Sequence, residues 1–111
     1  MEITDRSEGK ALVLCPKGRI DNDTAQAFQL RLLAGLAESG SVVVVDLAGV
    51  EYMSSAGLRA LMVASKHAKA NQCKVGVAAL QSVVKEIFAI SRFSFVVPVF
   101  DTPGDALAKL G

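Results

Sequence analysis

Short apolar runs, bounded by polar or turn-forming residues, alternate with amphipathic stretches along the chain. The run at 11–15 ends before Pro16 and Gly18, which is typical of a buried strand followed by a turn. The four valines at 42–45 are β-branched and do not alternate with polar residues, so they predict a central strand covered on both faces. A short strand near residues 2–5 is expected to add an antiparallel edge.

Two later apolar runs predict strands at 74–79 and 96–100. Pro98 lies inside the second run, and a proline has no N–H to donate to a neighbouring strand. The strand at 96–100 is therefore predicted to lie at an edge of the sheet.

Residues at helical spacing separate these strands. Asp23 followed by Gln26 three positions later is the pattern of a capping box at a helix start. The first helix is expected to end at Gly40, and the second, after a loop through Gly49, at Asn71. The positions of their buried faces are Ala25, Phe28, Leu32 and Leu36 in the first helix and Leu58, Leu61, Met62, Ser65 and Ala68 in the second.

Two more helices are predicted in the second half of the chain. The third is marked by Val83, Val84, Ile87 and Phe88. Thr102 as N-cap and Pro103 at the first helical position begin a fourth, short helix. The alternation predicts an α/β fold, with a mixed, mostly parallel sheet of four to five strands and about four helices, in which residues 1–111 form a single domain.

Composition and charge argue against several classes of function. The 12 Lys and Arg residues are balanced by 11 Asp and Glu residues, and aromatic residues make up 5% of the chain, which argues against nucleic-acid binding. The first ten residues are polar, unlike a signal peptide, and no apolar run approaches the roughly 18 residues of a membrane span. We therefore expect a cytoplasmic protein without direct membrane insertion, and a monomer when alone because no apolar seam is evident.

The residues of a metal or cofactor site are missing. Cys15 and Cys73 are far apart and His67 is the one histidine, so neither a zinc site nor a disulfide framework is predicted, and both thiols are expected to be buried. No glycine pattern of the dinucleotide or P-loop type follows a strand. A single histidine also lacks the partners of a Ser-His nucleophile, which argues against an enzyme.

The candidate site lies at 46–58, because sites of open α/β sheets gather where strands end and the following helices begin. Ser54 and Ser55 are at the predicted start of the second helix. A phosphate on Ser55 would meet free N–H groups and the positive end of the helix dipole. A plain N-cap by either serine explains the same pattern, and both interpretations are open at this point.

Three segments of the chain together resemble the STAS-domain anti-sigma factor antagonist (anti-anti-sigma factor) family, small bacterial proteins that act by partner switching. The segments are 18–25, which reads Gly-Arg-Ile-Asp-Asn-Asp-Thr-Ala, then 43–58, and finally 98–105, which includes Asp101, Thr102 and Asp105. The resemblance covers nearly the whole chain and implies a STAS-like fold.

In that family a kinase-type anti-sigma factor phosphorylates a serine at the start of the second helix. The match of Met53 and of Gly57-Leu58 to the family pattern implies that this serine is Ser55. Family members generally have Asp-Ser where this chain has Ser54-Ser55, so Ser54 is a candidate second acceptor.

The resemblance also assigns residues around the serine pair. Asp21 and Asp46 match acidic positions that flank the loop, and Asp21 and Thr24 are expected beside Ser55. A helix cap and a strand-end turn explain the two aspartates equally well. The residues assigned to the switch loop and the partner surface are Asp21, Thr24, Asp46, Met53, Ser54, Ala56, Gly57, Leu58, Arg59 and Val63.

Arg59 and Val63, with Lys66, are placed on one exposed flank of the second helix, for which a solvated basic flank is the alternative. The resemblance implies a non-enzymatic regulator whose unphosphorylated form binds a kinase-type anti-sigma factor and releases the sigma factor or another output protein. Phosphorylation of Ser55 would end this binding, and a serine/threonine phosphatase would restore it.

Two alternatives belong to other classes. One is a STAS interaction subunit of a lipid-transport or sensory complex without a phospho-switch. The other, a nucleotide- or metabolite-binding domain, is less favoured because no phosphate-cradling glycine pattern is present.

Overall fold

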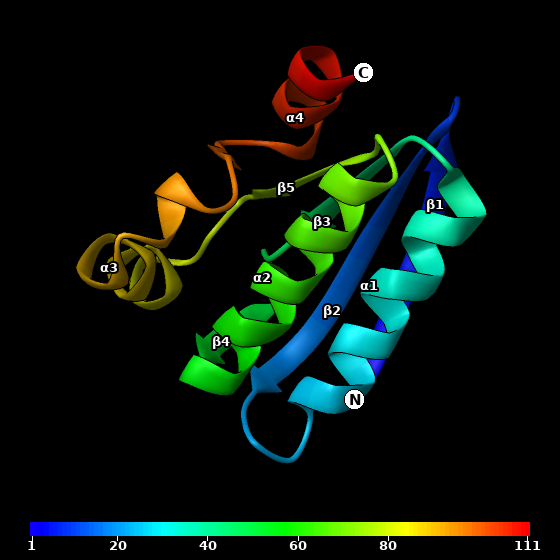
Figure 1. The fold of residues 1–111 in the computed structure, drawn as a ribbon. Coiled ribbons are helices and arrows are strands. Elements are labelled where there is room, and N and C mark those ends of the chain that lie inside the picture. Colours follow the sequence, from blue (N-terminus) through cyan, green and yellow to red (C-terminus); the bar gives the residue numbers. More distant parts are fainter.

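The computed structural model describes residues 1–111 and has one mixed β-sheet with helices on both faces (Figure 1). The strands are β1 (Glu2–Glu8), β2 (Ala11–Ile20), β3 (Val42–Asp46), β4 (Val50–Met53), β5 (Lys74–Ala78) and β6 (Val99–Phe100). The helices are α1 (Ala25–Ser39), α2 (Ser55–Ala70), α3 (Ser82–Ser91) and α4 (Pro103–Leu110), with a 3-10 turn η1 (Phe93–Phe95). The predicted α/β class and the four helices are confirmed, and the sheet has a sixth strand beyond the four to five expected.

The strand order is β1-β2-β3-β5-β6, and β4 pairs with β2 beyond the end of β3. Only β1 runs antiparallel to its neighbour, so the sheet is mostly parallel, as predicted. The antiparallel opening strand is present and is longer than the expected 2–5. No helix of the structure combines the length and the apolar character needed to cross a bilayer.

Alternate residues of the central strands face two layers of helices. Val43 and Val45 belong to the large core cluster of 22 buried residues, under α1, α2 and α3, and Figure 1 shows α1 and α2 side by side over the strands. Val42 and Val44 belong to a smaller cluster of five buried residues that includes Ala106 of α4. The valine run is therefore a central strand covered on both faces, as its lack of alternation predicted.

Strand β2 continues past the expected turn at Pro16 and Gly18, so the predicted boundary at residue 15 is wrong. The pairing with β3 ends at Leu14 and the pairing with β4 begins at Gly18. Pro16 lies in this interval, where its missing N–H removes no bond to a parallel neighbour. Gly18 has a φ of 98° at a register shift, a conformation that favours glycine.

The loop predicted through Gly49 contains strand β4, which was not predicted. The strand predicted at 96–100 is shortened to β6. The Val77 N–H donates to the Pro98 carbonyl at 3.0 Å. If the pairing of β6 with β5 began before Val99, residue 98 would also have to donate its own N–H to β5. Proline cannot donate that bond, so the pairing begins at Val99. The predicted edge position is confirmed.

The capping box predicted at Asp23 is also wrong, because the N-cap of α1 is Thr24. Thr24 Oγ1 accepts the Asp21 N–H at 2.9 Å and donates to the Arg19 carbonyl at 2.9 Å, while Asp21 Oδ1 accepts the Asp23 N–H at 3.0 Å. Asp21 and Thr24 thus close the turn themselves, and Asp23 has no capping role. The predicted end of α1 at Gly40 is confirmed, with a φ of 63°.

The other boundaries follow the predictions closely. Asn71 is the C-cap of α2, and Thr102 caps α4 by accepting the Asp105 N–H at 3.0 Å. Cys15 and Cys73 are free and half-buried rather than buried. Cys15 follows the last residue of β2 that pairs with β3, and Cys73 precedes the first residue of β5.

An ion-pair cluster joins the edge strand β1 to α1. Arg31 Nη2 lies 2.9 Å from Asp5 Oδ2, and Arg31 Nη1 lies 3.0 Å from Glu38 Oε2. The hydrogen bond to Asp5 is the main cause that raises the pKa of the Arg31 guanidinium above its usual value. Because both carboxylates are about half exposed, each pair contributes only about 0–1 kcal/mol.

Candidate functional site

The serine pair lies at the end of the molecule where β2 and β4 finish and α1 and α2 begin (Figure 1). Met53 pairs with Ile20 in the parallel register of β4 and β2, and the Ser54 N–H donates to the Ile20 carbonyl at 2.8 Å. Asp21 directly follows Ile20, so strand pairing brings the turn at 21–24 to the start of α2.

The two serines have different environments. Ser54 is half-buried and is the N-cap of α2, with its Oγ accepting the Gly57 N–H at 3.4 Å. Ser55 is the first residue of the helix and is exposed, and its hydroxyl has no hydrogen-bond partner within the chain. The capping interpretation is therefore confirmed for Ser54 and does not account for Ser55.

Replacing Ser54 by alanine should lower the free energy of unfolding by about 0.5–1 kcal/mol, the lower part of the range for N-caps because this hydrogen bond is long. Ser55→Ala should change it by less than about 0.5 kcal/mol, since Ser55 is an exposed side chain with no partner. Urea unfolding of the two variants measures both values. A larger loss for Ser55→Ala than for Ser54→Ala would contradict the assignment of the cap.

The start of α2 offers unpaired donors to an anion. The N–H groups of Ser55 and Ala56 have no backbone acceptor, as is usual in the first turn of a helix. The first turn also carries no acidic residue, so no carboxylate competes for the positive end of the helix dipole. A negative group on the Ser55 hydroxyl would therefore lie in a favourable local field.

Asp21 and Thr24 bond to each other, with 3.3 Å between Thr24 Oγ1 and Asp21 Oδ1. The structure brings this turn to the end that carries the serines, but neither side chain bonds to Ser55. Asp46 lies elsewhere, because β4 separates it from the serine pair. Its Oδ1 accepts the Ala48 N–H at 3.0 Å, as expected of a strand-end turn residue.

The other residues assigned to the site fall into two groups. Met53, the last residue of β4, and Gly57, in the first turn of α2, are both buried. Arg59 is exposed one turn beyond Ser55, where it can contact a partner. Ala56, Leu58 and Val63 are half-buried.

A pair of side chains near this end was not predicted from the sequence. The Arg19 guanidinium stacks over the Tyr52 ring at 4.5 Å from its centroid, and Arg19 Nε lies 4.0 Å from Asp21 Oδ2. Arg19 and Tyr52 face each other in the register of β2 and β4. A single sequence carries no signal for this pair, because β4 itself was not predicted.

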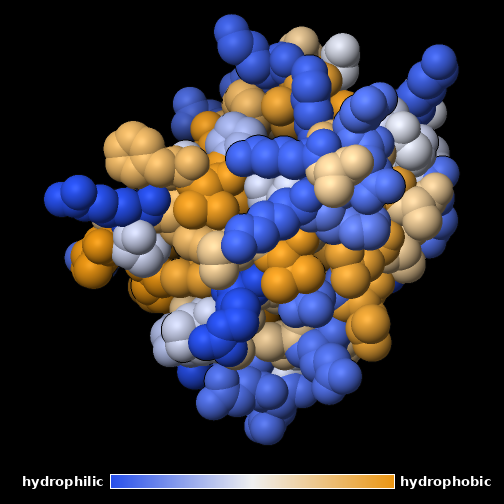
Figure 2. All heavy atoms as spheres, viewed as in Figure 1, coloured by the Kyte–Doolittle hydropathy of each residue, from blue (hydrophilic) through white to orange (hydrophobic).

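A second missed feature is an apolar surface on α3 and η1. Val83, Ile90 and Phe95 are exposed there, and Figure 2 shows apolar atoms reaching the surface on the left side of the view, over these elements. Helix α3 packs against β4, the strand that leads to Ser54. No three His, Cys, Asp or Glu side chains lie close enough together to hold a metal ion.

Comparison with known families accounts for this architecture. The profile of the STAS domain matches residues 2–106, nearly the whole chain. The chain belongs to the STAS domain family. A Bordetella bronchiseptica protein assigned as the anti-sigma factor antagonist BtrV is 31% identical to this STAS domain over 109 residues, which cover 97% of this chain and 93% of BtrV. Anti-sigma factor antagonists of this family are binding regulators and not enzymes.

Solved structures agree with this assignment. The crystal structure of an anti-sigma factor antagonist from Mycobacterium paratuberculosis superposes with a TM-score of 0.88 at 25% identity and covers 98% of this chain and 92% of that one. SpoIIAA of Bacillus shares the fold at lower identity. Its unphosphorylated form gives a TM-score of 0.80 at 11% identity, covering 97% and 95% of the two chains. Its phosphorylated form gives 0.71 at 10% identity, covering 99% and 100%.

Proposed function

We propose that this STAS domain is an anti-sigma factor antagonist that acts by partner switching, with Ser55 as its phosphorylated residue. The unphosphorylated protein binds a kinase-type anti-sigma factor and so releases a sigma factor or another output protein. Phosphorylation of Ser55 by that kinase ends the complex, and a serine/threonine phosphatase restores it. The relatives named as anti-sigma factor antagonists support the first part of this proposal.

The choice of Ser55 rests on the different roles of the two serine hydroxyls. The Ser54 hydroxyl is used by the helix cap, whereas the Ser55 hydroxyl is exposed and free. A kinase can therefore modify Ser55 without breaking a bond that holds the fold. The phosphate adds about −1.5 to −2 charges, which the unpaired N–H groups and the dipole of α2 partly compensate.

The same charge opposes binding of the partner. An interface that covers the start of α2 must remove water from the phosphate, and the penalty for burying an uncompensated charge is several kcal/mol. Asp21 lies at the same end of the molecule, so phosphorylation adds to charge of the same sign. We therefore expect the fold to persist while the complex is lost.

Ser55→Asp is expected to raise the dissociation constant for the kinase partner at least ~10-fold, whereas Ser55→Ala stays within ~3-fold of wild type. Wild type, Ser55→Ala, Ser55→Asp and the control Ser54→Ala serve as baits in native lysate. Captured proteins and phosphopeptides are identified by mass spectrometry. A captured protein with an ATP-binding kinase domain is then purified for calorimetric titration and for phosphorylation of each variant.

The proposal requires phosphate on Ser55 in wild type and in Ser54→Ala, and none in Ser55→Ala. Phosphate found on Ser54 alone would contradict the choice of acceptor. Capture of the same transporter or sensory subunits by all four baits, without a phosphopeptide spanning residues 54–55, would favour a STAS interaction subunit without a switch.

A further inference from the structure

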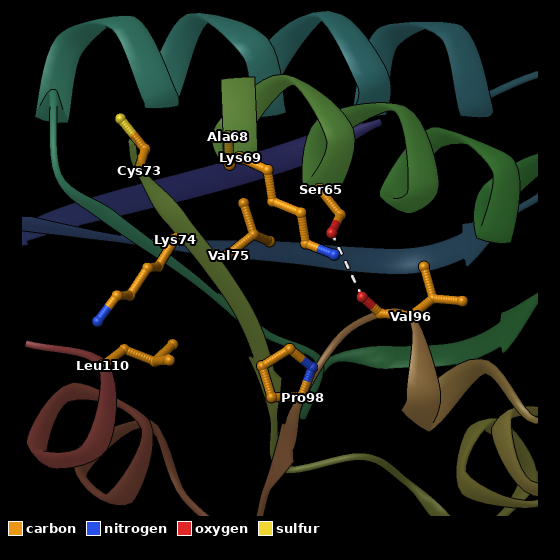
Figure 3. Close-up of a pocket in the computed structure, with 9 residues that line it drawn as sticks. All are labelled: Ser65, Ala68, Lys69, Cys73, Lys74, Val75, Val96, Pro98 and Leu110. Carbon is orange, nitrogen blue, oxygen red and sulfur yellow. Dashed lines mark hydrogen bonds between the residues drawn. The ribbon is translucent and has the colours of Figure 1, made fainter. Parts of the chain in front are cut away.

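A cavity of about 150 Å³ lies at the end of α2 opposite to Ser55. It is open to solvent on one side and is lined by the last turns of α2, the first residues of β5, the segment 96–98 and Leu110 of α4 (Figure 3). Most of its wall is apolar, and no Asp or Glu side chain lines it. An engineered apolar cavity of similar volume binds benzene, so one ring or a short alkyl chain fits this space.

Two lysines from different elements reach this cavity. Lys69 lies on α2 and Lys74 begins β5, and neither forms an ion pair within the chain. Figure 3 shows the Lys69 ammonium directed toward the hydrogen bond in which Ser65 Oγ donates to the Val96 carbonyl at 3.3 Å. The cavity thus has unneutralised positive charge at its border and apolar groups inside.

An unpaired backbone donor adds to this charge. The Lys74 N–H donates toward β3, to the Ser41 carbonyl, and the Val77 N–H donates toward β6, to the Pro98 carbonyl. Because these groups alternate along a strand, the Val75 N–H is directed to the same side as that of Val77. No backbone hydrogen bond joins Val75 to residues 96–98, since β6 pairs with β5 only from Val77 onward. Val75 therefore presents a free N–H where the cavity lies.

We propose that this cavity binds a small organic monocarboxylate whose apolar body is about the size of a benzene ring. The carboxylate accepts hydrogen bonds from the Lys69 ammonium and the Val75 N–H, which are charge-assisted. The apolar body lies between Ala68, Pro98 and Leu110. A single negative charge suits a wall that is mostly apolar, because removing water from a dianion costs more. The site is separate from the serine pair and does not depend on the partner-switching proposal.

The test is a titration of the ¹⁵N-labelled protein with benzoate, followed by the backbone amide shifts. Benzyl alcohol, which has the same ring without the charge, is the control ligand. Lys69→Met keeps the aliphatic chain and removes the charge, and Lys66→Met is the matched control because Lys66 is exposed on the same helix and does not line the cavity.

We expect a saturable benzoate shift that is largest at Val75. The dissociation constant should rise at least ~10-fold in Lys69→Met and less than ~2-fold in Lys66→Met, and benzyl alcohol should bind at least ~10-fold more weakly than benzoate. The proposal is overturned if the shifts do not saturate or if benzyl alcohol binds as well as benzoate. It is also overturned if the two lysine variants weaken binding equally.

Discussion

Phe88→Ala is expected to lower the free energy of unfolding by about 3–5 kcal/mol, the range for removing a large buried aromatic side chain. Phe88 is 2% exposed, and its ring meets that of Phe93 edge to face, with 5.4 Å between the ring centroids. Such a pair adds about 0.5–1.5 kcal/mol to the burial itself. Helix α3 has only Val84 and Phe88 as fully buried residues, so little else in the helix can compensate.

Phe95→Ala is the matched control, because Phe95 lies in the adjacent turn η1 and is 87% exposed. Its effect should stay within about 0.5 kcal/mol. Urea unfolding followed by circular dichroism measures both variants, and Phe88→Leu gives a milder change if the alanine variant does not fold. Equal losses for Phe88→Ala and Phe95→Ala would show that the packing of α3 is not as described.

Gly57→Ala is expected to cost about 1–3 kcal/mol and to move the first turn of α2, together with Ser55. A Cβ atom at residue 57 would lie 2.6 Å from Met53 Cγ and 2.8 Å from Ile20 Cγ2. Both of these side chains are fully buried, so neither can swing into solvent to make room. The glycine therefore allows the close approach of α2 to the ends of β2 and β4.

Gly104→Ala is the control for this prediction. A Cβ atom at residue 104 meets only Thr102 Oγ1, at 3.7 Å, and alanine is favoured over glycine inside a helix by up to about 1 kcal/mol. It should therefore leave the stability unchanged or raise it. Thermal unfolding compares the two variants, and the rate of Ser55 phosphorylation measures the displacement of the helix start. A Gly57→Ala variant as stable as wild type would contradict the close approach.

The elements predicted well from the sequence are those whose burial leaves a regular pattern. The valines at 42–45 are covered on both faces, and the apolar positions of α1 and α2 recur at helical spacing. In these segments the hydrophobic pattern directly reports which side chains face the core.

The errors concern residues whose meaning depends on distant partners. A proline ends a strand where its N–H would be needed for a bond to a parallel neighbour. Pro16 does not end β2, because it lies between the segment of β2 that pairs with β3 and the segment that pairs with β4. Pro98 shortens β6 for the opposite reason, since it lies where β5 needs a donor. Strand β4 is too short to show a period, and only its pairing with β2 identifies it.

At the candidate site, too, local patterns could be predicted from the sequence, and contacts between distant segments could not. The position of Ser54 and Ser55 at a helix start follows from local pattern, whereas the geometry was needed to show which serine is the cap. Asp46 is close to the pair in the sequence and lies at the far end of β4 in space. The contact of Arg19 with Tyr52 could not be foreseen without that strand.

Helix α4 is expected to open locally more readily than the other helices, because the two core clusters differ in size. Helix α4 has one fully buried residue, Ala106, and rests on the cluster of five, whereas α1, α2 and α3 rest on the cluster of 22. Detaching α4 therefore exposes far less apolar surface than global unfolding, and local opening of this helix has the lower free energy. Since Leu110 belongs to α4, such an opening would remove one wall of the cavity, which is already open to solvent, while the larger core stays intact. The helix that contributes least to the core thus forms one wall of the cavity, and this wall opens more readily than the walls formed by α2 and β5.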